Sequence, residues 1–303
     1  MIKTKKVLIT GSNGMLGEDI LNILKAKSDY NLFGVNRNLD NNLPEDRSII
    51  CNIINLKKFE KVVEEIDPEI IIHCAAMVDV DGCENNNEYA DKLNIESTKL
   101  LAAYKPEKTK LIYISTDSVF DGQKGGYSEE SIKNPLNYYA MTKSKAEEAV
   151  KKLNNNSIII RTNIYGFHKA KGKSLVEWAL SELLQNHEVN GFRDVYFNPV
   201  YTKQLAKTII GLLNIDFSGI IHVGASKALS KYEFLNKLAM NFNVDTKLVK
   251  SISIDDITLE AKRPKNTSLE TNKLQTLLDC KLNIDDGINE LYRDYIEGGI
   301  NIE

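Results

Sequence analysis

Short apolar runs alternate with helical patterns along the first half of the chain. The apolar runs are four or five residues long and occupy positions 7–10, 32–35, 48–51, 70–74, 111–115 and 158–161. Between them, apolar residues recur with helical periodicity near 15–27, 56–66, 86–104 and 137–154. Because several runs are apolar almost throughout, we expect strands that are covered on both faces. The alternation predicts an α/β fold with a doubly wound parallel sheet of the Rossmann type.

The first apolar run leads into a glycine-rich turn with the sequence Gly-Ser-Asn-Gly-Met-Leu-Gly. In such a turn the first glycine lets the chain turn off the strand, the second lets the backbone approach a phosphate, and the third lets the helix pack close. Free N–H groups and the helix dipole then favour a bound diphosphate. A turn that binds nothing is the alternative. The residues assigned to this cradle are Gly11, Asn13, Gly14, Met15, Leu16 and Gly17.

The alternation loosens after residue 161. A helix-like run over 174–184 leads into 190–200, which contains Asn-Gly, Asn-Pro and several aromatic residues. With 303 residues the chain has room for about two domains. We therefore predict a dinucleotide-binding Rossmann domain over residues 1–161. Residues 162–303 are expected to form mainly a smaller C-terminal substrate-binding lobe, with some segments returning to the Rossmann domain.

The ends of the later strands supply the other candidates for cofactor binding. Asn36 lacks the charge that would repel a ribose 2′-phosphate, and Arg37 could pair with one. We therefore expect NADP(H) to be preferred, with NAD(H) as the other candidate; a solvated surface arginine is the alternative interpretation. Asn52 and Ile53 follow the third strand, within reach of an adenine. The set is completed by Cys74, Ala75, Ala76, Asn94 and Ser115, together with Tyr139 and Lys143.

Tyr139 and Lys143 are predicted to lie one turn apart on one face of a helix. A nearby ammonium lowers the pKa of a phenol, so Tyr139 could act as general acid or base toward a carbonyl oxygen. Such pairs are common on solvated helix faces, but this one follows the glycine turn and a strand ending in Ser-Thr-Asp. Thr116 can donate to the same oxygen, and Asn94 can support the lysine through a backbone carbonyl or a water. The combination predicts a dehydrogenase-type site.

With these motifs the chain resembles the extended short-chain dehydrogenase/reductase superfamily, and within it the dTDP-4-dehydrorhamnose reductase family. The pieces that carry the resemblance span nearly the whole chain: 11–17, 75–84, 114–122, 134–139 and 263–269. The resemblance implies hydride transfer from a nicotinamide to the C4 ketone of a nucleotide-linked 6-deoxyhexose. It implies that Tyr139 is the proton donor and that Lys143 binds the nicotinamide ribose. On the substrate side it places Thr116, Asp117 and Asp81, with Arg263 as a clamp for the diphosphate.

The chain departs from that family on the sugar side of the expected site. Ser118 stands where members usually have a tyrosine, and Met77 where they usually have an aromatic residue or a histidine. After the sixth strand, residues 161–166 lack the tryptophan that packs on the sugar in the family. These departures leave the chemistry in place but put rhamnose itself in doubt, so a related 4-keto sugar is open.

Composition limits the classes of partner. Hydrophobic residues make up 42% and charged residues 27% of the chain, the net charge is −3, and no basic stripe appears, so no nucleic-acid partner is expected. No apolar run of signal-peptide or transmembrane length occurs, so we expect a cytoplasmic protein without a membrane partner. The expected partner is the small nucleotide-sugar substrate, and a homodimer is open. The cysteines lack metal-ligand spacing and are expected to be reduced and packed: Cys51, Cys74, Cys83 and Cys280.

Other notable residues favour structural interpretations. His73 and His222 lie in apolar runs and are expected to be core histidines, and no metal site is expected. The single tryptophan, Trp178, is expected in the core. Arg193 is a second candidate for a phosphate clamp, with a salt bridge as the alternative for both it and Arg263.

Three functions remain open on the sequence alone. The first is an NAD(P)H-dependent reductase of a nucleotide-linked 4-keto-6-deoxysugar, in nucleotide-sugar and surface polysaccharide biosynthesis. The second is an epimerase or dehydratase that keeps its NAD bound; the absence of an acidic pair after Thr116-Asp117 speaks against the dehydratase. The third is a non-enzymatic regulatory relative that has kept the fold, against which the intact Tyr139 and Lys143 argue.

Overall fold

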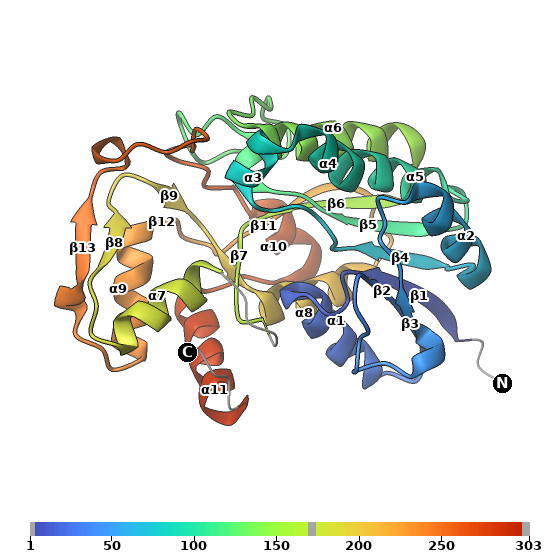
Figure 1. The fold of residues 1–303 in the computed structure, drawn as a ribbon, viewed down its shortest axis with the longest axis horizontal. Coiled ribbons are helices and arrows are strands. Elements are labelled where there is room, and N and C mark those ends of the chain that lie inside the picture. The colour runs from blue at the N-terminus through green and yellow to red at the C-terminus, as the bar shows by residue number, and fades with distance from the viewer. Residues whose placement is uncertain (1–3, 169–173, 299–303) are drawn as a thin grey trace.

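The computed structural model describes residues 4–168 and 174–298. Its centre is a seven-stranded sheet in the order β11-β6-β5-β4-β1-β2-β3, with every pair of neighbours parallel (Figure 1). The strands are β1 (Lys5–Thr10), β2 (Tyr30–Asn36), β3 (Ser48–Ile50), β4 (Ile70–His73), β5 (Lys110–Ile114), β6 (Ser157–Thr162) and β11 (Gly219–Val223). The strand order reverses between β1 and β4, and ligands of open α/β sheets bind at the carboxyl ends of the strands there.

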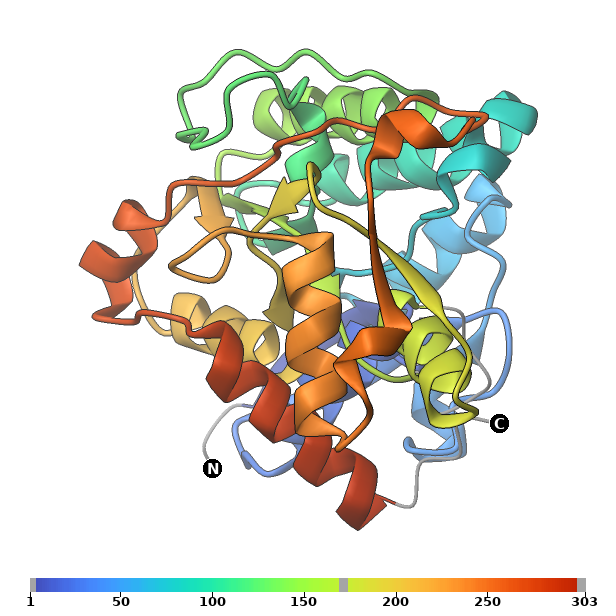
Figure 2. The ribbon, with the colours of Figure 1, turned by 90° about the vertical axis from the view of Figure 1, so that its left-hand side faces the viewer.

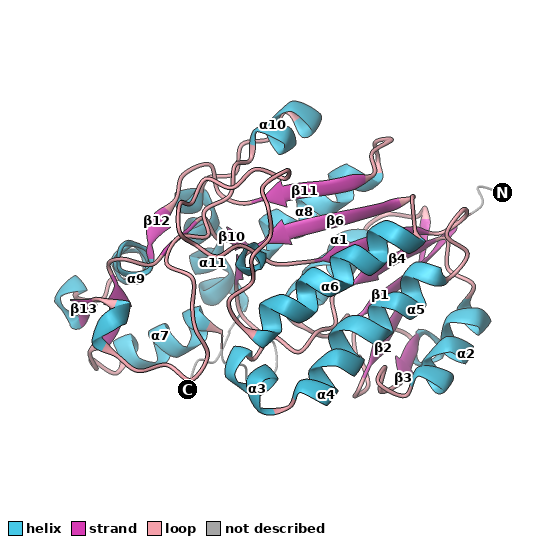
Figure 3. Ribbon diagram, turned by 90° about the horizontal axis from the view of Figure 1, so that it is seen from above, coloured by secondary structure: helices cyan, strands magenta, loops and turns pink. Residues whose placement is uncertain are grey.

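Helices cover both faces of this sheet, as the apolar strands require. One face packs against α2 (Leu56–Ile66), α5 (Ser97–Ala103) and α6 (Tyr138–Leu153) (Figure 3). The other packs against α1 (Met15–Lys25), α8 (Thr202–Leu213) and α10 (Asn272–Leu278). The doubly wound parallel fold is therefore confirmed, and the six strands and four helices expected before residue 161 are all present.

Short helical segments connect the main elements along the chain. They are η1 (Glu45–Arg47), α3 (Val80–Asn85), α4 (Asn87–Ala90), the π-helix η2 (Asp91–Glu96), η3 (Asp117–Val119), η4 (Thr246–Leu248) and η5 (Ile254–Asp256). α4, η2 and α5 follow one another without a break, so the single helix expected over 86–104 carries a π turn in its middle. Such turns often occur at functional sites.

The second half of the chain contributes both to the large sheet and to a smaller lobe. β11, α8 and α10 pack with the sheet, whereas the lobe contains α7 (Leu175–Leu184), α9 (Lys231–Asn241) and α11 (Ile284–Gly298). Three two-stranded pairs accompany these helices. They are β7 (Ile164–Tyr165) with β10 (Val200–Tyr201), β9 (Tyr196–Phe197) with β12 (Leu229–Ser230), and β8 (Val189–Phe192) with β13 (Val249–Ile252).

Residues 257–271, which we call the strap, tie the smaller lobe to the carboxyl edge of the large sheet. The strap crosses above the lobe toward the loop before α6 (Figure 2). Asn137, the N-cap of α6, donates to the backbone oxygen of Lys262 at 2.9 Å. Thr267 donates to the carboxylate of Asp117 at 2.6 Å. The start of the helix that carries Tyr139 and Lys143 is thus held by the C-terminal part of the chain.

The structural interpretations of His73 and His222 are confirmed, because both are buried and burial lowers the pKa of each to about 3. The four cysteines are free thiols, and burial raises the pKa of each. The core position expected for Trp178 is wrong: its side chain is 43% exposed. The helical period alone could not show which face of α7 meets the core.

A buried ion pair joins α6 to the end of β6. Glu147 accepts from Nε and Nη2 of Arg161 at 3.0 and 2.8 Å, and both side chains are 2% exposed. The hydroxyl of Ser115, just after β5, donates to the same carboxylate at 2.6 Å. The guanidinium lies over the Phe120 ring and also donates to the backbone oxygen of Glu129 at 3.3 Å. The arginine therefore holds four segments of the Rossmann core together.

Glu147→Gln should lower the free energy of unfolding by about 3–5 kcal/mol, because it leaves the guanidinium of Arg161 buried without its counter-charge. Urea denaturation followed by circular dichroism measures the change. Glu148→Gln is the matched control: Glu148 is 68% exposed, shares Lys133 with Glu147 and is not paired with Arg161, so a change below about 1 kcal/mol is expected. Equal effects of the two substitutions would contradict the assignment.

Candidate active site

The glycine turn forms a tight backbone cradle in which residues with side chains could not replace Gly11 or Gly17. Gly11 has φ +68°, and a Cβ at Gly17 would lie 2.1 Å from the backbone oxygen of Gly11. Gly14 is the N-cap of α1 and carries no side chain to cap the helix, so the first N–H groups of α1 face outward from the sheet edge. Asn13, Met15 and Leu16 complete this turn. The geometry fits a diphosphate, as expected for a dinucleotide.

Buried polar side chains support this cradle from beneath: Asn36, which was expected at the cofactor, and Ser12 and Asp40, which the sequence did not reveal. The amide of Asn36 donates to the Ser12 hydroxyl at 2.8 Å and accepts from the N–H of Asn13 at 3.3 Å. The Ser12 hydroxyl in turn donates to the carboxylate of Asp40 at 2.6 Å, which is 1% exposed. Asn36 and Asp40 therefore position the turn, while Arg37 lies exposed beside them at the end of β2. A single aspartate in a polar stretch of sequence does not indicate a buried side chain, so the role of Asp40 could not be predicted.

The remaining cofactor candidates gather at the same edge of the sheet. Asn52 is exposed and Ile53 is buried after β3. Cys74, Ala75 and Ala76 are half-buried after β4, and a Cβ on Gly11 would lie only 3.1 Å from the nitrogen of Ala75. The candidates after β3 and β4 thus lie at the same carboxyl edge of the sheet as the glycine turn after β1.

The structure brings Thr116, Tyr139 and Lys143 together at the carboxyl end of β5. The side chain of Thr116 is hydrogen-bonded to the phenol of Tyr139. Nζ of Lys143 donates to the backbone oxygen of Ile114 at 2.6 Å and lies 4.3 Å from the centroid of the Tyr113 ring. Thr116 after β5 and Tyr139 on α6 are thus paired, while the ammonium of Lys143, on the same helix, is directed to the last carbonyl of β5.

Burial dominates the electrostatics of this cluster. It raises the pKa of Tyr139, and the Asp117 carboxylate adds to the rise while the hydrogen bond from Thr116 opposes it. The expected lowering by Lys143 is therefore wrong for this structure, because the ammonium reaches down to the Ile114 carbonyl. Burial also lowers the pKa of Lys143 to about 7, against the attraction of the Glu147 carboxylate. The phenol is protonated at neutral pH and can serve as an acid.

Asn94 acts on the site through neighbouring backbone. It lies within the π turn η2, and its amide accepts from the N–H of Met77 at 2.8 Å and donates to the backbone oxygen of Met77 at 3.1 Å. It also donates to the hydroxyl of Thr142 at 3.0 Å, beside Lys143. Nζ of Lys143 donates to the carbonyl of Ile114 and not to that of Asn94, which accepts from Thr98 at 2.8 Å. Support of the lysine through a water stays a prediction. Asn94 fixes the loop after β4 and the face of α6.

The candidates for substrate binding occupy the seam between the two lobes. Asp117 is 1% exposed and accepts from Asn163 at 3.0 Å as well as from Thr267 of the strap. Burial raises its pKa. Arg263 is paired with Asp81, both oxygens of which lie 3.0 Å from its Nη2. A salt bridge between the lobes thus engages both residues, while Arg193 pairs at the surface with Asp256 at 3.9 Å.

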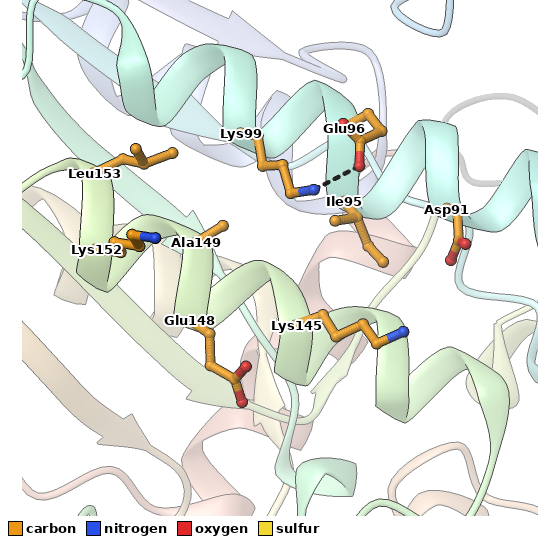
Figure 4. Close-up of a pocket in the computed structure, with 9 residues that line it drawn as sticks. All are labelled: Asp91, Ile95, Glu96, Lys99, Lys145, Glu148, Ala149, Lys152 and Leu153. Atoms are coloured by element: carbon orange, nitrogen blue, oxygen red, sulfur yellow. Dashed lines mark hydrogen bonds and ion pairs between the residues drawn. The ribbon is translucent and has the colours of Figure 1, made fainter.

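A groove on the surface of the molecule lies away from these residues. It has a volume of about 490 Å³ and runs between η2–α5 and α6 on the outer surface, where Lys99 pairs with Glu96 at 2.7 Å (Figure 4). Its lining is mostly charged and includes none of the catalytic candidates.

Within residues 4–168 and 174–298 no cluster of metal-ligating side chains occurs. In the same ranges every helix is too short or too polar to cross a bilayer.

Comparisons with known proteins agree with this arrangement. The crystal structure of dTDP-4-dehydrorhamnose reductase from Bacillus anthracis in complex with NADP superposes with a TM-score of 0.86 at 28% identity, covering 96% of this chain and 99% of that one. The probable low-salt glycan biosynthesis reductase Agl14 of Haloferax volcanii is 29% identical over 282 residues, 90% of this chain and 92% of the relative. Methionine adenosyltransferase 2 subunit beta of Pongo abelii is 30% identical over 284 residues, 91% and 83% of the two chains.

A family model covers most of the chain as well. The model described as RmlD substrate binding domain matches residues 5–295, a span that includes the glycine cradle, the Thr116–Tyr139–Lys143 cluster and the strap. The match therefore extends over both lobes and the seam between them. The chain belongs to the RmlD substrate binding domain family, within the short-chain dehydrogenase/reductase superfamily.

Proposed function

We propose that this protein is a reductase that transfers a hydride from NADP(H) to the 4-keto group of a nucleotide-linked 6-deoxysugar. The observation that carries the proposal is the convergence of Thr116, Tyr139 and Lys143 at the sheet edge that also holds the glycine cradle. Relatives that are named reductases, one of them solved with NADP, support it. The product would serve the biosynthesis of a surface polysaccharide or a related glycoside.

Each side chain of the cluster has a separate part in the proposed reaction. The bound nicotinamide supplies the hydride. Tyr139 donates its proton to the oxygen that becomes negative as the ketone is reduced, and Thr116 donates a hydrogen bond to the same oxygen. Lys143 binds the nicotinamide ribose, and its positive charge stabilises the phenolate left after proton transfer. Stabilisation that appears only as the oxygen gains charge raises kcat.

The residues on the sugar side put the 4-keto precursor of rhamnose in doubt as the substrate. Ser118 is half-buried beside Asp117 and donates to it at 3.2 Å, and Met77 follows the small residues after β4. Residues 161–166, at the end of β6 and just after it, contain no tryptophan. With smaller and less aromatic walls than the family pattern, the site suits a related 4-keto-6-deoxysugar.

A regulatory subunit without activity is the second candidate. The match to methionine adenosyltransferase 2 subunit beta favours it, because that relative is named as a subunit and covers 91% of this chain. The intact catalytic cluster speaks for the reductase. An epimerase or dehydratase with resident NAD is a third candidate.

Consumption of NADPH at 340 nm tests the reductase directly. The substrate is dTDP-4-dehydro-6-deoxyglucose made in place from dTDP-glucose by a dehydratase, with a C3/C5 epimerase added or omitted. Consumption only with the epimerase supports a rhamnose-type reductase, and consumption without it supports a different 6-deoxyhexose. Absence of consumption in both contradicts the proposed reaction with these sugars.

Tyr139→Phe should lower kcat by about 100- to 10,000-fold, because it removes the proton donor. NADPH affinity should change little, and fluorescence titration measures it. Tyr138→Phe is the matched control: its phenol is hydrogen-bonded to Asp91 outside the cluster, so kcat should stay within about twofold. Retention of most of the turnover in Tyr139→Phe would remove that residue from its role.

Arg37→Gln tests the preference for NADP(H). Loss of an exposed guanidinium that pairs with the 2′-phosphate should raise KM for NADPH about tenfold or more and leave KM for NADH unchanged. Steady-state kinetics with each cofactor provide the measurement, with NADH as the internal control. Equal changes for both cofactors would contradict the pairing.

A further inference from the structure

His73 ends β4 beside the last residue of β1. The two strands are neighbours in the sheet, and Thr10 and His73 are partners in their register (Figure 1). His73 is 2% exposed and Thr10 is completely buried. Both ring nitrogens are engaged: Nδ1 lies 2.7 Å from Oγ1 of Thr10, and Nε2 lies 3.0 Å from Oγ1 of Thr98 on α5. The imidazole therefore joins the end of β1 to α5, which an apolar core residue could not do.

The neighbouring hydrogen bonds fix the direction of each bond in this chain. Oγ1 of Thr98 donates to the backbone oxygen of Asn94 at 2.8 Å, so it accepts from Nε2–H of His73. Nδ1 then carries no proton and accepts from the hydroxyl of Thr10. That hydroxyl oxygen accepts in turn from the N–H of Ala75 at 3.2 Å. Every donor of the chain thus has a partner, and burial, which lowers the pKa of His73 to about 3, keeps the ring neutral.

One end of this chain lies at the glycine cradle. Thr10 is the residue directly before Gly11. A Cβ on Gly11 would lie 3.1 Å from the nitrogen of Ala75, the same nitrogen that donates to Thr10. The turn after β1 and the loop after β4 are therefore held against each other by the hydroxyl that His73 orients.

The other end reaches the helix that carries Lys143. The side chain of Asn94 holds the N–H and the backbone oxygen of Met77 and donates to the hydroxyl of Thr142 at 3.0 Å. Thr142 directly precedes Lys143 on α6. The chain thus runs from the cradle that fits a diphosphate to the helix that carries the lysine proposed for the nicotinamide ribose.

We propose that His73 is a positioning residue for the dinucleotide, which as the Nε2–H tautomer holds the glycine cradle through Thr10 and the π turn through Thr98 at a set spacing. The inference rests on the proposed function, because it takes the ligand to be a nicotinamide dinucleotide. The diphosphate and the nicotinamide ribose belong to one molecule, so the two halves of the site bind it best when their spacing is fixed beforehand. His73 acts through the two threonines and not by contact with the ligand.

Two substitutions each remove one bond of His73. Glutamine can donate to Thr98 from the position of Nε2 but offers no acceptor to Thr10, whereas asparagine can accept from Thr10 at the position of Nδ1 but does not reach Thr98. His73→Gln should therefore weaken NADPH and ADP, a fragment with the diphosphate but without the nicotinamide ribose, by the same factor of about 5- to 30-fold. His73→Asn should weaken NADPH by a similar factor and leave ADP unchanged. Calorimetric titration measures both ligands.

Three further variants separate this role from a loss of stability. Thr10→Val and Thr98→Val remove the same two bonds from the other side, so they should repeat the patterns of the glutamine and asparagine variants, including where a His73 variant does not fold. His222→Gln is the matched control: His222 is completely buried on β11, at the edge of the sheet, and the variant should bind both ligands as the wild type does.

The tautomer is measured in the wild-type protein by NMR of isotope-labelled histidine. Nε2 of His73 should carry the proton and Nδ1 none, without change from about pH 5 to pH 8. A proton on Nδ1 would overturn the inference, and so would variants that lose both ligands alike or bind both as the wild type does. The reductase proposal is judged separately: a protein that shows the expected binding pattern but oxidises no NADPH keeps the role of His73 and loses the reaction.

Discussion

The buried pair of Glu147 and Arg161 is the contact on which the candidate site depends. It fixes the helix that carries Tyr139 and Lys143 against the ends of β5 and β6, and it takes the hydroxyl of Ser115 into the same network. Two unlike charges at 2% exposure are stable only while both are present. The pair therefore fixes where α6, and with it Tyr139, lies relative to the sheet edge. Ser115 was expected to contact the cofactor, but its hydroxyl donates to the Glu147 carboxylate of this pair.

Burial shifts the pKa values of Tyr139 and Lys143 in opposite directions. The same removal from water that raises the pKa of Tyr139 lowers that of Lys143, so both groups are biased toward their neutral forms. A neutral phenol is an acid, which is the form that reduction of a ketone requires.

The sequence predicted the parallel sheet and the glycine turn because both depend on local patterns. Strand apolarity, helix periodicity and glycine spacing are properties of neighbours in the chain. The buried role of Asp40, the contacts of Asn94 and the pairing of Asp81 with Arg263 depend on segments that meet only in the fold.

The same limit explains the error at Trp178. A tryptophan in an apolar helix fits a core position in sequence, yet its side chain is 43% exposed. Only the packing of α7 against the other elements of the smaller lobe shows the indole exposed.

A single experiment with labelled cofactor tests the central claim that this chain delivers a hydride to the C4 ketone of a nucleotide-linked sugar. NADPH carrying deuterium at the reactive position of the nicotinamide is incubated with the dTDP-4-keto-6-deoxysugar, and the product is examined by mass spectrometry and NMR. The account predicts one deuterium per product molecule, bonded to C4 of the sugar. A product without deuterium, as an enzyme that recycles a resident hydride would give, or an unchanged substrate, as a regulatory subunit would give, contradicts it.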